Sequence, residues 1–162
     1  FSSLVLMIIF LFLCISFVPI EILYVDIPFF TTVLTNSTFS SLFVLLCFLF
    51  VINGANLIDG FNGLLTINLM IINSILAYIN LANGITEFSI IIFGQIIVLF
   101  SFLLFNFPSA KIFLGDSGSY FLGSLVALNV IITNNLNPDY SSFFFCTLLF
   151  YLFVYVLRLS KF

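Results

Sequence analysis

Long apolar runs recur along the whole chain and constrain its fold more than any other feature. They fall at residues 4–20, 40–53, 64–82, 88–105, 119–134 and 141–158. A helix needs about 20 apolar residues to cross the hydrocarbon core of a bilayer, so the chain has room for about six crossings. Only 6% of its residues are charged, whereas a soluble domain has about 25%. The sequence therefore predicts an integral membrane protein.

The apolar runs predict helices rather than strands. They are too long for strands and lack the alternation of a lipid-facing barrel. A helix also satisfies its backbone polar groups within one segment, as hydrocarbon requires. Since the sequence shows no internal repeat and no second domain, we expect residues 1–162 to form one all-α transmembrane bundle of about six helices.

The charged residues lie in the connectors and sort into two groups when alternate crossings are counted. One end receives Glu21, Asp26, Glu87 and Asp139, and the other receives Asp59, Lys111, Asp116, Arg158 and Lys161. All three basic residues fall at the second end, which the positive-inside rule assigns to the cytoplasm. We therefore expect a multi-pass protein whose second-end connectors face the cytoplasm.

The composition excludes several classes of function. The chain has no histidine, which removes Ser-His-Asp triads, HExxH zinc sites and histidine acid–base chemistry. A net charge of −3 with three basic residues provides no electrostatic surface for nucleic acid.

Five amide side chains lie inside the apolar runs: Asn68, Asn73, Asn80, Gln95 and Asn129. Hydrogen bonds between helices are the simplest role for such groups. Asn73 and Asn80 point to nearly the same side of one helix, so we expect that side to face protein. A transporter path lined by these amides is the alternative from another functional class.

Two second-end connectors, residues 53–64 and 105–119, differ from the others in composition. Each holds one aspartate, Asp59 or Asp116, among several Gly, Asn or Ser residues. A carboxylate near a bilayer is costly without water, a cation or a donor, so both are candidates for function. Two carboxylates with amide and hydroxyl neighbours form an all-oxygen environment, which suits Mg²⁺ or Mn²⁺ and a phosphate-bearing substrate. Two solvated loops without a ligand are the alternative.

At these connectors the sequence resembles the polyprenyl-phosphate N-acetylhexosamine-1-phosphate transferases and the related phospho-N-acetylmuramoyl-pentapeptide transferases. The first motif is present as Asn53, Asn56, Asp59, Gly60, Asn62, Gly63 and Leu64. The second is present as Asn106, Phe113, Gly115, Asp116, Ser117 and Gly118, with Pro108 and Ala110 close to register. Two long motifs in this order, separated by two spans, are far more specific than either alone.

The resemblance implies a reaction and its partners. A UDP-N-acetylhexosamine would give its sugar-1-phosphate to a polyprenyl phosphate such as undecaprenyl phosphate, with UMP as the second product and Mg²⁺ as cofactor. Glycan synthesis at a bacterial inner membrane is the implied setting, and a homodimer is one option for the assembly. The sequence after Asp116 looks closer to the N-acetylhexosamine branch. A CDP-alcohol phosphotransferase fits less well, because its aspartates would cluster on one helix.

The resemblance also implies roles for individual residues. Asp116 would be the Mg²⁺ ligand, and Asp59 would orient the nucleotide sugar or assist the metal site. The other implied substrate contacts are Asn53, Asn56, Asn62, Asn106, Ser117, Gly115 and Gly118, of which the two glycines would allow close backbone approach. Asn62 stands where the family pattern has a second aspartate, so this position loses a charge but keeps hydrogen-bonding capacity.

Two further features of the family are missing from this sequence. They are an Asp-Asp pair expected upstream of Phe1 and a His-rich segment expected after Lys161. The chain also begins at Phe1 rather than Met and ends directly after a span. We therefore expect a fragment that is inactive alone; a catalytically incomplete truncated copy of the enzyme is the alternative.

Overall fold

A computed structural model describes residues 21–22, 25, 27–109, 111–142 and 144–149. The regular structure within these residues is helical throughout, as the sequence predicts. The short helix α2 (Pro28–Leu34) precedes four long ones: α3 (Ser37–Ile58), α4 (Leu64–Ala82), α5 (Thr86–Asn106) and α6 (Gly115–Leu136). Each long helix is apolar and long enough to cross a membrane. The described residues thus belong to a multi-pass membrane protein.

The four long helices correspond to the four central apolar runs. The predicted span 64–82 coincides with α4, whereas α3 and α6 extend several residues beyond the predicted 40–53 and 119–134. The last predicted span, 141–158, is described only to residue 149 and is helical over 144–149. The first, 4–20, lies outside the described residues.

Helix α2 lies in the connector between the predicted spans 4–20 and 40–53. It begins with Pro28, whose fixed φ and missing N–H suit the first turn of a helix. Asn36 then caps α3, because its side-chain oxygen accepts a hydrogen bond from the Thr38 backbone N–H at 3.1 Å. The connector therefore approaches α3 through an ordered turn.

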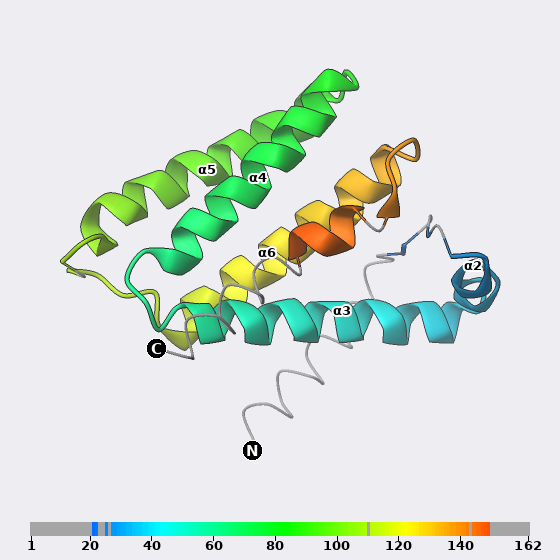
Figure 1. The fold of residues 1–162 in the computed structure, drawn as a ribbon, viewed down its shortest axis with the longest axis horizontal. Helices are drawn as coiled ribbons and strands as arrows, with labels where there is room; N and C mark the ends of the chain where they lie inside the picture. The colour runs from blue at the N-terminus through cyan, green and yellow to red at the C-terminus, as the bar shows by residue number, and fades with distance from the viewer. Residues whose placement is uncertain (1–20, 23–24, 26, 110, 143, 150–162) are drawn as a thin grey trace, which may run out of the picture.

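The four long helices are arranged as two packed pairs (Figure 1). Helices α4 and α5 form an antiparallel hairpin, and α6 packs against both α3 and α4. The connectors 59–63 and 107–114 meet at one end of the bundle, which we call the site end. Residues 83–85 and 137–141 lie at the opposite end. Helix α6 joins α3 to the hairpin, because it packs against both α3 and α4.

The described charged residues lie at the ends that the crossing count predicts. Asp59, Lys111 and Asp116 are at the site end, and Glu87 and Asp139 are at the opposite end. Glu21 is also at the opposite end, where its carbonyl oxygen accepts a hydrogen bond from the Asn135 side chain at 2.6 Å. Asp26, Arg158 and Lys161 are outside the described residues.

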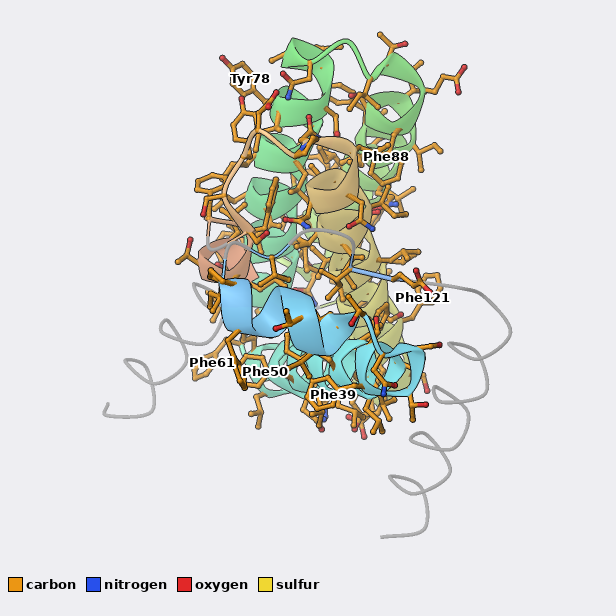
Figure 2. All side chains as sticks on the ribbon, turned by 90° about the vertical axis from the view of Figure 1, so that its right-hand side faces the viewer. Phe39, Phe50, Phe61, Tyr78, Phe88 and Phe121 are labelled. Atoms are coloured by element: carbon orange, nitrogen blue, oxygen red, sulfur yellow. The ribbon has the colours of Figure 1, made fainter. Side chains whose placement is uncertain are left out.

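The bundle is apolar both inside and outside. Its core contains Val44, Ala55, Leu76 and Ile92, all fully buried, and many large apolar side chains point outward. Figure 2 shows Phe39 and Phe50 on the side of α3 that faces away from the other helices. Such an exterior is unfavourable in water and favourable in lipid.

Buried amides join the helices in the middle of the bundle. Asn129 on α6 donates to Asn73 on α4 at 3.1 Å and to Gln95 on α5 at 2.6 Å. Asn80 on α4 donates to the Thr133 hydroxyl on α6 at 2.9 Å and accepts from Asn137 at 2.9 Å. The predicted interhelical role of these amides is confirmed, as is the burial of Asn73 and Asn80. These hydrogen bonds also occupy amides that a transporter path would need.

Asn68 differs from the other in-span amides. Its side chain donates to the Leu64 carbonyl of its own helix at 2.8 Å, so the predicted interhelical hydrogen bond is wrong for this residue. The side chain is buried, and the bond to the preceding turn satisfies its amide N–H without a partner on another helix.

Candidate functional site

The first motif is mostly helical, unlike the connector that the sequence predicts over 53–64. Asn53 and Asn56 lie in the last two turns of α3, and Asp59 is its C-terminal cap. The helix continues through the Gly-Asn run, where Gly54 and Ala55 are buried and Ala55 lies against Gly123 of α6, because small residues allow two helices to approach closely. The true connector is therefore the short segment 59–63.

The second motif ends the connector and begins α6. Asp116 lies in the first turn of this helix and is exposed together with Ser117. Gly115 has φ +64° and no heavy atom within 4 Å of a Cβ built on it. A ligand could thus approach its backbone. At Gly118 an added Cβ would meet the Leu114 side chain at 3.1 Å, so a glycine at this position also leaves room for Leu114.

The two aspartates of the motifs lie close enough to interact. Burial raises the pKa of Asp59 above its ordinary value of 3.8, and the negative charge of Asp116 raises it further. Asp116 lies at the N-terminus of α6, where the helix dipole favours a negative charge. The structure thus brings the two motifs together at one place, with two carboxylates that repel each other unless a proton or a cation is present.

Because of this repulsion, the difference in melting temperature between wild type and Asp59→Asn should depend on pH. The pKa of Asp59 is raised in the folded protein. Between the ordinary pKa and this raised pKa, the folded protein therefore binds more protons than the unfolded chain. The free energy of unfolding of the wild type falls as the pH rises through this range. We expect the melting temperature of Asp59→Asn, relative to wild type, to increase between about pH 3.5 and neutrality without divalent cations. Thermal unfolding in detergent with EDTA measures this difference, and a difference that is constant or decreases with pH would contradict it.

A hydrogen-bonded contact joins the two helices one turn behind the carboxylates. The Ser119 hydroxyl lies 2.8 Å from the Asn56 side-chain oxygen and 3.0 Å from the Asp116 carbonyl oxygen. The Asn56 amide nitrogen in turn donates to the Tyr120 hydroxyl at 3.2 Å. An asparagine side chain offers two donors and two lone pairs, so Asn56 keeps capacity for a substrate contact.

Asn106 holds the two connectors together. Its side-chain oxygen accepts a hydrogen bond from the Gly63 N–H, and its amide donates to the Ile112 carbonyl at 2.7 Å. Gly63 has φ +74° and lies tightly against Phe107, which favours glycine at this position. Asn62 contacts the second connector more weakly, through the Pro108 carbonyl at 3.5 Å. The hydrogen bonds of Asn106 thus hold the two connectors together, and the substrate contact predicted from the sequence would be an additional role.

The remaining predicted residue, Asn53, is turned back along α3. Its side chain is half-buried and donates to the Leu49 carbonyl at 2.7 Å. Sequence reasoning missed Ser119 and Tyr120 as residues that build the site, and it gave Gly63 no role beyond its place in the first motif. The position of Ser119 three residues after Asp116 on one helix would have indicated a shared face.

The donor set fits a hard cation that keeps part of its coordination shell for substrate. Asp59 and Asp116 supply carboxylate oxygens, and Ser117 is an exposed hydroxyl beside them in sequence. Among the described residues, no three acidic or cysteine side chains come together as a metal cage. Mg²⁺ typically uses one or two carboxylates together with water and substrate phosphates, so these residues suit it better than a metal that needs an all-protein site.

Comparisons with known proteins assign the chain to a family. Residues 1–134 match the family model described as glycosyl transferase family 4. A phospho-N-acetylmuramoyl-pentapeptide-transferase from Leuconostoc mesenteroides is 45% identical over 82 residues, which are 49% of this chain and 25% of that protein. One of the same name from Streptococcus agalactiae is 37% identical over 111 residues, 67% of this chain and 30% of that protein.

An archaeal relative carries a different name. A Sulfolobus acidocaldarius protein, provisionally named UDP-N-acetylglucosamine–dolichyl-phosphate N-acetylglucosaminephosphotransferase, is 45% identical over 76 residues, 46% of this chain and 23% of that protein. The aligned segment is thus less than a third of each of these relatives. No solved structure matches the chain. Because the family model covers most of its length, the chain belongs to glycosyl transferase family 4.

Proposed function

We propose that the chain forms part of an enzyme that transfers an N-acetylhexosamine-1-phosphate from a UDP-sugar to a membrane polyprenyl phosphate. An oxygen of the lipid phosphate attacks the sugar-bearing phosphorus of the UDP-sugar, the bond from that phosphorus to UMP breaks, and UMP leaves with the electron pair. The products are a polyprenyl-pyrophosphoryl sugar and UMP. The observation that supports this proposal most is the meeting of Asp59 and Asp116, from two separate motifs, at one end of the bundle.

The site residues have distinct roles in this proposal. Asp116 is the ligand of Mg²⁺, or of Mn²⁺ in its place, and Asp59 orients the nucleotide sugar or assists the ion. A bound ion supplies positive charge between two phosphate groups that would otherwise repel each other. The exposed backbone at Gly115 and the side chain of Ser117 lie beside Asp116 in sequence and are the groups best placed for phosphate oxygens. Asn53, Asn56, Asn62, Asn106 and Gly118 remain the other proposed substrate contacts.

The membrane setting follows from the same chemistry. A lipid phosphate remains at the bilayer surface while a nucleotide sugar comes from the cytoplasm, so we place the site end at the cytoplasmic face of a bacterial inner membrane. Undecaprenyl phosphate and a UDP-N-acetylhexosamine are the proposed substrates, and initiation of a cell-envelope glycan is the proposed role. A homodimer is the proposed assembly.

An exchange reaction tests this function. We expect the natural full-length chain that contains this segment to incorporate labelled UMP into UDP-N-acetylglucosamine when polyprenyl phosphate and Mg²⁺ are present. Omission of the lipid phosphate, or addition of EDTA, should reduce exchange to background because both are part of the reacting complex. Replacing the sugar nucleotide with UDP-N-acetylmuramoyl-pentapeptide distinguishes the two branches of the family. Absence of exchange with either nucleotide, or exchange that does not need lipid phosphate, would contradict the proposal.

A further inference from the structure

Ser119 is the most buried polar side chain near the site. It is fully inaccessible to solvent, although it lies three residues after the exposed Asp116. Its single hydroxyl proton is shared between the Asn56 side-chain oxygen at 2.8 Å and the Asp116 carbonyl oxygen at 3.0 Å. Ser119 therefore contacts protein on every side and is not a substrate contact.

The contact has matching positions on the two helices. Asn56 lies three residues before Asp59, and Ser119 lies three residues after Asp116. Residues three apart lie on the same side of a helix. The Asn56–Ser119 hydrogen bond thus joins α3 and α6 one turn behind the two carboxylates, and a change in this bond would move one carboxylate relative to the other.

The helices are also in near-backbone contact at the next turn of α6. A Cβ placed on Gly123 would lie 2.9 Å from the Ala55 Cβ and 3.1 Å from the Ile52 Cα. Small residues allow the two helices to come this close. The directional hydrogen bond beside the crossing point adds a constraint on the orientation of the first turn of α6.

We propose that Ser119 is a positioning residue that fixes the separation of Asp59 and Asp116 for divalent-cation binding. It does so by holding the first turn of α6 against Asn56, while Tyr120 holds the amide nitrogen of the same asparagine. This inference rests on the proposed function, since it concerns the cation site of that function. Loss of the Ser119 hydroxyl frees the Asp116 turn and weakens cation binding without removing a ligand.

Mn²⁺ binding to the purified full-length protein, followed by electron paramagnetic resonance, tests the inference. We expect Ser119→Ala to weaken Mn²⁺ affinity by about 10-fold, a typical effect for a residue that positions a metal ligand. Ser124→Ala is the matched control, because Ser124 lies on the same helix and its hydroxyl bonds only to the Phe121 carbonyl of that helix, at 2.7 Å. We expect this control to bind Mn²⁺ like wild type.

A second variant protects the test against misfolding of Ser119→Ala. Asn56 is only half-buried, so the space that Asn56→Ala opens is partly accessible to solvent, and this variant should weaken Mn²⁺ binding through loss of the same hydrogen bond. The Ser119→Ala, Asn56→Ala double variant should bind Mn²⁺ no more weakly than the single variant of lower affinity, because the two changes remove the same interaction. In the exchange assay, Ser119→Ala should raise the half-saturating Mn²⁺ concentration and leave the rate at saturating Mn²⁺ within about two-fold of wild type.

The outcomes separate the inference from the function on which it depends. Wild-type affinity in Ser119→Ala and Asn56→Ala, with Mn²⁺ bound by the wild-type protein, would overturn the inference and leave the proposed function in place. Equal weakening in Ser119→Ala and Ser124→Ala would also overturn it. A wild-type protein that binds no Mn²⁺ would overturn the metal site of the proposed function itself.

Discussion

Asp116→Asn should lower the rate of UMP exchange by about 1,000-fold, the scale of effect seen when a group that stabilises developing charge is removed. The change keeps the shape of the side chain and its position in the first turn of α6, but a neutral amide is a poor ligand for Mg²⁺. The measurement is label exchange at saturating lipid phosphate across a series of Mg²⁺ concentrations.

Asp139→Asn is the matched control for Asp116→Asn. Asp139 is an exposed aspartate at the opposite end of the bundle, after α6 ends. We expect this variant to exchange label at the wild-type rate. Undiminished exchange in Asp116→Asn would remove this residue from the metal site, and equal losses in both variants would indicate a general effect of charge.

Gly123→Ala should destabilise the protein by forcing α3 and α6 apart. The added Cβ would lie 2.9 Å from the Ala55 Cβ, and alanine has no alternative rotamer, so the helices must move apart. Overpacking of this kind typically destabilises a protein by about 1–3 kcal/mol. Thermal unfolding in detergent measures the loss, and Mn²⁺ affinity should fall with it because the two carboxylates lie on the separated helices.

Gly94→Ala provides the comparison for this variant. Gly94 lies on α5, where no heavy atom is within 4 Å of a built Cβ. Alanine favours a helix over glycine by up to about 1 kcal/mol, so this variant should unfold at the same or a higher temperature. If Gly123→Ala were as stable as Gly94→Ala, the close crossing of α3 and α6 would be wrong.

The sequence predicted the spans well because long apolar runs have few alternatives in a membrane. The run 64–82 predicts α4 without error, since Gly63 and Asn83 interrupt the pattern at both ends. The prediction ended α3 at residue 53 rather than 58 because Gly and Asn disfavour helices locally. Tertiary packing of Ala55 against Gly123 of α6 overrides that preference, and a single sequence does not show which helix will pack there.

The candidate site shows the same limit at the level of side chains. The motifs identified Asp59 and Asp116, and alternate crossings placed both aspartates at one end of the bundle. The contacts of Asn106 could not be predicted, because its partners Gly63 and Ile112 lie on two different connectors. A sequence pattern does not show how two connectors fold against each other. Ser119 was missed for a related reason, since its partner Asn56 lies 63 positions earlier in the chain.

The buried amides have a consequence for biosynthesis. Asn73 on α4 and Gln95 on α5 both find their hydrogen-bond partner in Asn129 on α6. During synthesis α4 and α5 emerge from the ribosome before α6, so both amides enter lipid before their partner exists. A nascent chain stopped after α5 would therefore lack the partner that satisfies these two polar groups in hydrocarbon, so the bundle is complete only once α6 has entered the membrane.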